Sequence, residues 1–201
     1  DKEVGFDLSY VKDTLGWLKE GKVVVLKSTI VPGTTEQLQK EFPQHNFLFN
    51  PEFLVEEKAE EDMVKPDRQI IGYTKQGREF AEDVLQMLPR APYEKVMPAT
   101  EAEMVKYIGN TFLALKVTFG NQMYELCQKL GIDYDVAREA ASADPRIGPS
   151  HLDVKHGGYR GYGGKCLIKD TRALIQIAKK VDMHVPLLET EEEYNNKLLD
   201  E

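Results

Sequence analysis

The spacing of hydrophobic residues changes near residue 99 and divides the chain into two parts. In the first part, short apolar runs are separated by stretches in which apolar residues recur every three or four positions. Such runs predict buried strands, and such stretches predict amphipathic helices. The expected strands are residues 22–27, 46–50, 69–73 and 93–96, and the expected helices are residues 7–20, 76–88 and a segment that begins near Thr34. Strands that alternate with helices indicate an α/β fold with a parallel sheet.

The second part begins with one long helical pattern. Residues 100–130 contain no proline, and their apolar residues recur at intervals of three or four, namely Met104, Ile108, Phe112, Leu115, Phe119, Met123, Leu126 and Leu130. These positions form one seam of about eight helical turns. A seam of that length needs a large partner surface, and the same helix of a second copy would provide it. Thr100 and Glu103 have the spacing of a capping box at the start of this helix.

Shorter helical segments follow the long one. The pattern predicts helices at residues 135–143 and 171–181 and another from residue 189 onward. We therefore expect an α/β domain at residues 1–98, an all-α domain at residues 99–188 and the start of a linking helix at residues 189–201.

Composition excludes several classes of protein. The chain has 201 residues, of which 41% are hydrophobic and 30% are charged, and its net charge of −8 argues against a protein that grips the nucleic-acid backbone. Its two cysteines, Cys127 and Cys166, form no disulfide framework, which favours the reducing cytoplasm. We see no apolar run long enough for a membrane span and no signal peptide.

Candidate chemistry is concentrated around Cys166. This cysteine lies in a predicted loop rich in glycine, which permits the close approach of another molecule to the backbone. Lys165 and Lys169 are cations that would favour a reactive thiolate, and Asp170 could serve as a base. The alternative is a glycine-rich surface turn with an inert, packed cysteine. We expect Cys127, inside the long helix, to be packed and inert.

Polar residues also follow two predicted strands, where ligands bind in open α/β sheets. Residues 28–35 are rich in hydroxyl groups and glycine, although a plain loop that caps a helix would have the same composition. Glu52 and Glu56 follow the next strand, four residues apart, and either line a cleft or lie on a solvated helical face.

Further candidates lie in the second part of the chain. Lys106 and Asn110 share one face of the long helix, and plain solvent exposure is the simpler explanation for both. His151 and His156 do not have the spacing of a metal site with other ligands, so we expect no metal.

Six motifs, in this order, resemble the UDP-glucose/GDP-mannose dehydrogenase family over almost the whole chain. Each motif is weak by itself, but their order makes the resemblance specific. They are Ser28-Thr29-x-x-Pro32-Gly33-Thr34, Asn50-Pro51-Glu52-Phe53-Leu54-x-Glu56, Pro66-Asp67-Arg68, Glu101-Ala102-Glu103-x-x-Lys106-Tyr107-x-x-Asn110-Thr111, Pro145-Arg146-Ile147-Gly148 and Gly161-Tyr162-Gly163-Gly164-x-Cys166-Leu167-x-Lys169-Asp170.

The resemblance implies a reaction and its participants. It implies the second half of a Rossmann-like NAD-binding domain, followed by a helical domain that forms a homodimer through residues 100–130. The implied reaction is the NAD-dependent oxidation of the C6 alcohol of a nucleotide sugar to a carboxylate, in two hydride transfers through a thiohemiacetal and a thioester.

The resemblance also implies a role for each matching residue. Cys166 would be the nucleophile, Lys106 and Asn110 would stabilise the oxyanion, and Asp170 would act as a base with a water or with Lys106. Other residues would bind the reactants: Glu52, Phe53, Leu54, Arg146, Tyr162 and Gly163 the nucleotide sugar, Thr29 and Lys169 the cofactor, and Glu56 the nicotinamide region while assisting hydrolysis.

The chain also departs from the family pattern. The Gly-x-Gly-x-x-Gly fingerprint that grips the pyrophosphate is absent, and so is the C-terminal nucleotide-binding domain. Ile168 replaces the usual proline. We therefore expect a fragment or truncated member with impaired NAD binding and turnover.

Two other functions remain open. The first is a catalytically silent paralogue that serves as a dimerisation module, and the second is a thiol redox protein, although no partner cysteine lies near Cys166 in sequence. UDP-glucose, GDP-mannose and N-acetylated UDP-sugars all remain possible substrates.

Overall fold

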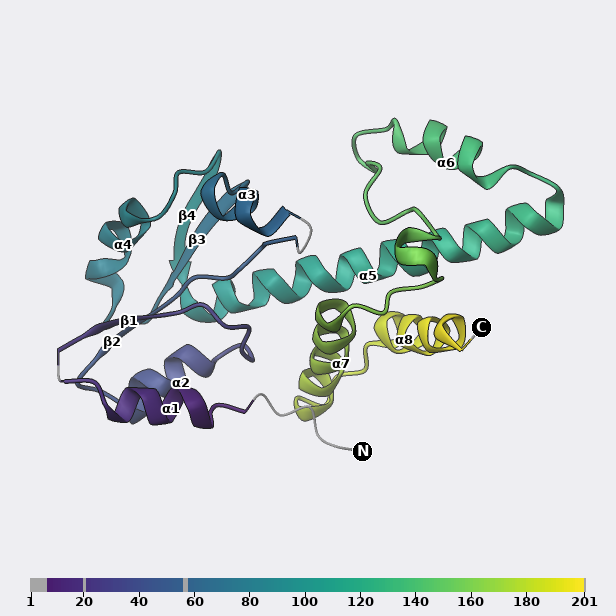
Figure 1. The fold of residues 1–201 in the computed structure, drawn as a ribbon. Helices are drawn as coiled ribbons and strands as arrows, with labels where there is room; N and C mark the ends of the chain where they lie inside the picture. Colours follow the sequence, from purple (N-terminus) through teal and green to yellow (C-terminus); the bar gives the residue numbers. More distant parts are fainter. Residues whose placement is uncertain (1–6, 20, 56–57, 201) are drawn as a thin grey trace. The chain divides into compact units, whose positions relative to one another are not determined.

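The computed structural model describes residues 7–19, 21–55 and 58–200, which form two compact units (Figure 1). The division falls within helix α5 (Ala99–Leu130), between Lys106 and Tyr107. Each unit is described by itself. The expected domain boundary at residues 98–99 stays a prediction.

A four-stranded sheet forms the centre of the first unit. Its strands are β1 (Val23–Leu26), β2 (Asn46–Phe49), β3 (Arg68–Tyr73) and β4 (Tyr93–Pro98), in the order β1-β2-β3-β4. The helices of this unit are α1 (Ser9–Gly16), α2 (Thr34–Glu41), α3 (Ala59–Val64) and α4 (Ala81–Met87), the last preceded by a 3₁₀ turn at Arg78–Phe80. The predicted strands and helices are therefore present, with ends that differ by a few residues.

The sheet is mixed, which corrects the expectation of parallel strands throughout. β1 pairs parallel with β2, and β3 parallel with β4, but β2 and β3 are antiparallel. The connection between β2 and β3 contains only the six-residue helix α3 among its described residues, which rises about 9 Å. Because β3 starts at the edge where β2 ends, the chain needs no full crossover helix.

Alternate residues of strand β2 face two different helical layers. Phe47 and Phe49 pack with Leu15 of α1 and Leu38 of α2, and all four side chains are buried. Leu48 points to the other face, where it packs with Leu85 of α4. Figure 1 shows α1 and α2 on one side of the sheet and α4 on the other. A strand covered on both faces explains the continuous apolar runs in the sequence.

The start of α5 lies directly on β3. Gly72 of β3 is so close to this helix that an added Cβ would lie 2.7 Å from the Cβ of Ala102 and 2.9 Å from the Cα of Ala99. Ala99 and Ala102 are fully buried. Three small residues thus allow the helix to approach the sheet, and the position of the first turns of α5 is fixed by backbone contact.

The second unit is helical. After α5 it contains α6 (Tyr134–Ser142), a 3₁₀ turn at His156–Gly158, α7 (Lys165–Lys180) and α8 (Pro186–Leu199). Helix α7 begins six residues earlier than predicted, so Cys166 lies in its first turn and not in a loop. The reason is packing: the half-buried Leu167 and Ile168 contact a core formed by Ala114, Val117 and Tyr162. The predicted fold class, a Rossmann-like sheet followed by helices, is confirmed.

We predict that Gly72→Ala lowers the free energy of unfolding by about 1–3 kcal/mol, because the new methyl group overlaps α5. Chemical unfolding by urea, followed by circular dichroism, measures the change. Gly16→Ala is the matched control: an added Cβ there meets nothing within 4 Å, and alanine favours the helix. Equal stabilities of the two variants would contradict the close approach.

Candidate functional site

The loop after β1 is held by a buried carboxylate on α5. The backbone N–H of Gly33 donates to Oε2 of Glu103, and the backbone N–H of Thr35 donates to Oε1 over 2.8 Å. The Thr35 hydroxyl also donates to Oε1. Glu103 is only 1% exposed. This is not the expected capping box with Thr100, because α5 already begins at Ala99 and Glu103 binds the start of α2 instead.

Burial and hydrogen bonding act on Glu103 in opposite directions. Burial raises the pKa of this carboxyl group, while the hydrogen bonds from Thr35 and Gly33 lower it, and burial has the larger effect. The carboxylate also lies at the N-terminal end of α2, where the unpaired N–H groups favour a negative charge. Glu103 therefore orders the loop between β1 and α2.

The loop after β2 is held by a second network. Lys27 donates from Nζ to Oδ1 of Asn50 over 2.7 Å, and Asn50 donates from Nδ2 to the carbonyl of Ile70 over 2.9 Å and to Oε1 of Gln69 over 3.3 Å. Asn50 is 1% exposed. The buried amide thus ties the carboxyl ends of β1 and β2 to the start of β3.

Lys106 reaches the same loop from α5. Its Nζ donates to the backbone carbonyl of Glu52 over 2.7 Å. Glu103 and Lys106 are three residues apart on the helix, so one turn of α5 holds both the loop after β1 and the loop after β2. The ammonium group has two further N–H donors that these contacts do not use.

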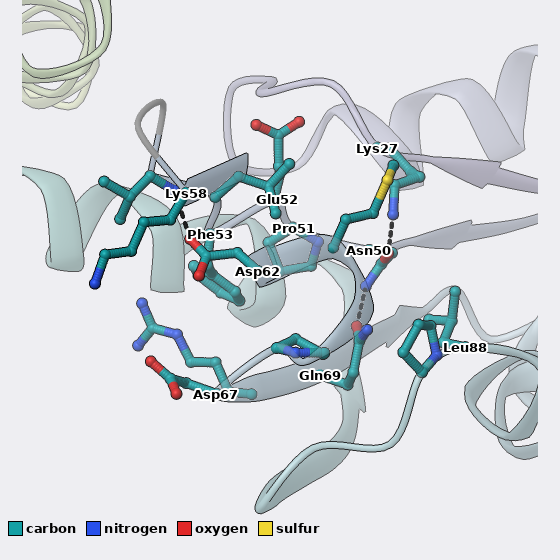
Figure 2. A pocket seen from close by; sticks show the side chains of 16 residues that line it. Lys27, Asn50, Pro51, Glu52, Phe53, Lys58, Asp62, Asp67, Gln69 and Leu88 are labelled. Atoms are coloured by element: carbon teal, nitrogen blue, oxygen red, sulfur yellow. Dashed lines mark hydrogen bonds between the residues drawn. The ribbon is translucent and has the colours of Figure 1, made fainter. Parts of the chain in front are cut away.

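A pocket of about 570 Å³ opens at these strand ends (Figure 2). Figure 2 shows the hydrogen-bonded row of Lys27, Asn50 and Gln69 on one side, and Lys58 and Asp62 on the other. The pocket carries charges of both signs, from Lys27, Lys58, Arg68, Glu52, Asp62 and Asp67. A polar molecule of mixed character suits such a lining.

Three of the predicted sugar-binding residues line this pocket. They are Glu52, Phe53 and Leu54. The Phe53 ring is covered by the guanidinium group of Arg68, whose Cζ lies 3.8 Å from the ring centroid, so the loop is held by a cation–π contact as well. Glu56 was predicted to lie nearby, but it falls outside the described residues.

The second unit brings Asn110 and Asp170 together. Asn110 of α5 donates from Nδ2 to Oδ2 of Asp170 over 2.6 Å, and Asp170 is fully buried. Lys169 lies beside it, with Nζ 3.5 Å from Oδ1 of Asp170. Cys166 is exposed one helical turn before Asp170 on α7. A thiol at the surface and an oriented, buried carboxylate thus share one face of the helix.

The glycine loop before Cys166 is held by α8. Oδ1 of Asn195 accepts from the backbone N–H of Tyr162 over 2.8 Å, and its Nδ2 donates to the carbonyl of Tyr162 over 3.0 Å. Gly161 has φ 77°, and a Cβ there would lie 2.6 Å from Oδ1 of Asn195. Glycine is therefore required at this position both by its conformation and by the close approach.

The remaining predicted residues of the second unit occupy different environments. Arg146 is exposed, and its guanidinium group pairs with both carboxylate oxygens of Asp144, the shorter contact being 2.6 Å. The Gly163 N–H donates to the Tyr159 hydroxyl over 3.2 Å, and the Tyr162 side chain is buried. Within the described residues, no group of three acidic, histidine or cysteine side chains could hold a metal ion.

Comparisons with known proteins identify the family of this chain. Residues 1–88 match the NAD binding domain of the UDP-glucose/GDP-mannose dehydrogenase family, and residues 100–197 match its central domain. The chain belongs to this family.

Members of the family are similar along most of the chain. The UDP-glucose 6-dehydrogenase of Rhizobium meliloti (strain 1021) is 38% identical over 92% of the chain and 44% of its own length. The UDP-glucose 6-dehydrogenase TuaD of Bacillus subtilis (strain 168) is 37% identical over 95% of the chain and 43% of its own length. A UDP-glucose dehydrogenase structure from Pyrobaculum islandicum superposes with a TM-score of 0.84 at 34% identity, over 98% of the chain and 48% of its own length. The chain thus spans less than half the length of these relatives.

The end of β1 fits the NAD-binding domain that this family match indicates. Thr29 and Ser28 follow β1, and their hydroxyl groups make no hydrogen bond within residues 7–19, 21–55 and 58–200. Thr29 is half-buried at the carboxyl end of a parallel strand, the usual place for a cofactor in such sheets. That Thr29 faces the cofactor stays a prediction.

The structure of this dehydrogenase-family chain shows structural roles that sequence patterns did not predict. Glu103, Asn50 and Asn195 hold the loops on which the predicted residues lie, and all three are nearly fully buried. A polar residue within an apolar helical pattern was the available signal for Glu103 and Asn195. Lys106 lies in the first unit and Cys166 in the second, so their expected approach stays a prediction.

In the described residues, no helix combines the length and hydrophobicity that a membrane span requires.

We predict that Glu103→Ala lowers the free energy of unfolding by about 2–4 kcal/mol, because two backbone N–H groups lose their acceptor. Thermal and urea unfolding measure the loss. The exposed Glu101, two residues earlier on α5, provides the control Glu101→Ala, which should cost about 1 kcal/mol or less. A Glu103 variant as stable as this control would show that the loop does not depend on the carboxylate.

Proposed function

We propose that the protein to which this chain belongs oxidises the C6 alcohol of a nucleotide sugar to the acid, with NAD as the hydride acceptor. The observation that carries the proposal is the exposed Cys166 in the first turn of α7, one turn from the buried Asp170 that Asn110 orients. The relatives named UDP-glucose 6-dehydrogenase support the substrate class. When it is bound, NAD accepts the hydride in both oxidations.

Cys166 is the proposed nucleophile. Its thiolate adds to the carbonyl carbon of the aldehyde, the C–S bond forms, and the oxygen becomes an oxyanion that takes up a proton as the thiohemiacetal. The second oxidation converts this adduct to a thioester. Water then breaks the C–S bond, which releases the carboxylate and returns the thiolate. The N–H groups of the first helical turn favour negative charge close to Cys166.

The other catalytic roles follow from hydrogen-bonding capacity. Asn110 uses one N–H on Asp170 and has a second for an oxyanion, and Lys106 likewise has donors beyond the one on Glu52. Asp170 is the proposed base, acting with a water or with Lys106, and Glu56 assists hydrolysis.

The proposed binding roles remain those that the motifs indicate. Glu52, Phe53 and Leu54 hold the sugar in the pocket, and Thr29 and Lys169 face the cofactor. Arg146, Tyr162 and Gly163 contact the nucleotide sugar. UDP-glucose is the first substrate to test, because the relatives carry that name.

Dimerisation through α5 forms part of the proposal. Several apolar side chains of this helix are at least half exposed within the second unit: Ile108, Phe112, Phe119, Leu126 and Leu130. They recur at intervals of four and seven residues and so share one face of α5. An exposed apolar stripe of this length suits a second copy of the same helix. A dimerisation module without activity is the second candidate function, and this stripe is the observation that favours it.

Cys166→Ser should lower acid formation by roughly 10³-fold or more, because serine is a far weaker nucleophile. The measurement follows NADH and the sugar acid with UDP-glucose, GDP-mannose and N-acetylated UDP-sugars. It uses the 201-residue chain and the same chain extended by the flanking parts of a relative. Cys127→Ser, at a half-buried cysteine on α5, is the control and should retain activity. Absence of NADH with every sugar in the extended protein would leave the dimerisation module as the function.

Phe112→Glu combined with Phe119→Glu should raise the dimer dissociation constant by about 10²-fold or more, because each change removes an aromatic anchor and places a charge in the interface. Sedimentation velocity measures the change. Gln128→Glu, at an exposed position on another face of α5, is the control. A wild-type chain that is monomeric at every concentration would refute the dimer.

A further inference from the structure

The motif Pro66-Asp67-Arg68 has no assigned role in the proposed reaction. Its arginine is the first residue of β3 and is paired in register with Tyr93 of β4. Arg68 also lines the pocket at the strand ends, and its Cζ lies 3.8 Å from the centroid of the Phe53 ring. Arg68 therefore connects a strand that the sheet holds in place to the loop that follows β2.

The contact with the ring distinguishes this guanidinium group from an ordinary ionic partner. Within residues 7–19, 21–55 and 58–200, the guanidinium group of Arg68 makes no hydrogen bond and no ion pair. A cation within about 6 Å of a ring centroid is attracted by the negative face of the ring. The planar guanidinium group can also stack flat on the ring, which the ammonium group of a lysine cannot do. The stack on Phe53 is thus the contact that the position of this side chain serves.

The loop after β2 is held at both ends and in its middle. At one end, Asn50 donates to the carbonyl of Ile70 in β3. At the other end, the Val55 N–H donates to a carboxylate oxygen of α3 over 2.9 Å. Between these ends, the half-buried Phe53 packs against the hydrophobic core that α1, α2 and the sheet form. Phe53 therefore restrains the middle of the loop, and Arg68 restrains Phe53.

The backbone next to Phe53 is the part of the loop with proposed chemistry. The carbonyl of Glu52 accepts from Nζ of Lys106 over 2.7 Å, and residues 52–54 are the proposed sugar contacts. If the ring is free to leave its place, the peptide groups on both sides of it lose their restraint. Lys106 itself stays in place, because α5 is held against β3 by a separate backbone contact. Loss of the stack should therefore weaken sugar binding more than it slows the reaction.

We propose that Arg68 is a positioning residue for the nucleotide sugar: its guanidinium group, stacked on Phe53, holds residues 52–54 in the conformation that binds the sugar. Arg68 acts through the ring and not as an ionic partner of a substrate phosphate. The statement about the sugar rests on the proposed function, whereas the restraint on the loop rests on the contact between Arg68 and Phe53.

A fluorescent reporter tests the restraint without turnover. Trp17 is the single tryptophan of the chain, so Trp17→Phe combined with Phe53→Trp places one indole ring beneath Arg68. In this 201-residue chain, Arg68→Lys should raise the acrylamide quenching constant of the indole about two- to fivefold, because the ring loses its planar cover.

The control for the reporter is a second arginine on an aromatic ring. Arg78 lies over Tyr73, at the opposite end of β3, with its Cζ 5.2 Å from the ring centroid. Arg78→Lys should leave the quenching of the indole at position 53 unchanged. Equal quenching with arginine and with lysine at position 68 would overturn the proposal.

A double-mutant cycle tests the effect on the substrate. In the chain extended by the flanking parts of a relative, Arg68→Lys should raise KM for the nucleotide sugar about two- to fivefold, while kcat and KM for NAD change less than about twofold. A general loss of structure would change all three constants. Phe53→Leu removes the ring, and Arg68→Lys should have no further effect in that background.

The cycle also separates stacking from direct binding. If Arg68→Lys still raises KM for the sugar in the Phe53→Leu background, the guanidinium group binds the substrate itself and the positioning role is wrong. Arg78→Lys is again the control and should leave the three constants unchanged.

The two proposals fail separately. If the extended protein oxidises no nucleotide sugar, the proposed function is wrong, and the quenching of the indole still decides whether Arg68 restrains the loop. If neither the quenching nor KM responds to Arg68→Lys, the positioning role is wrong, and Cys166→Ser still tests the reaction.

Discussion

The carboxylate of Glu103 is the contact on which the first unit depends. A loop between a strand and a helix leaves backbone N–H groups without partners, and burial makes each of them costly. Glu103 satisfies two of these groups, at Gly33 and Thr35, from the first turns of α5. Gly72 lets the same turns lie against β3. The helix α5 and the loops at the carboxyl ends of the strands are therefore fixed together. This arrangement also fixes the position of Lys106.

In the second unit, a side-chain amide provides the hydrogen-bond partners for loop backbone groups. The glycine loop has little side-chain packing of its own, and Asn195 of α8 binds the N–H and the carbonyl of Tyr162 in place of a secondary-structure partner. Asn110 holds Asp170 in a similar way. In both units, a buried polar side chain from another element holds a loop that carries residues of proposed chemical function.

The spacing of apolar residues predicted the strands and helices well, because an element that is buried on one face or on both shows a regular pattern in its own sequence. The strands and most helices begin and end within a few residues of the predicted positions. The start of α7 was missed because the glycines at 163 and 164 indicate a loop, whereas Leu167 and Ile168 find apolar partners on α5 that local sequence does not show. The antiparallel pairing of β2 and β3 was missed for a related reason: the direction of a strand depends on where its connection runs.

The sequence by itself determined the two-part fold and, through six ordered motifs, the dehydrogenase family. Those properties are carried by residue types and spacings along the chain. Only the tertiary structure decided that Glu103 binds a loop and caps nothing on its own helix, and that Asn195 holds the glycine loop. The partners in these contacts are about 30 to 70 residues apart, and burial, which sets the energy of each contact, exists only once the elements have packed.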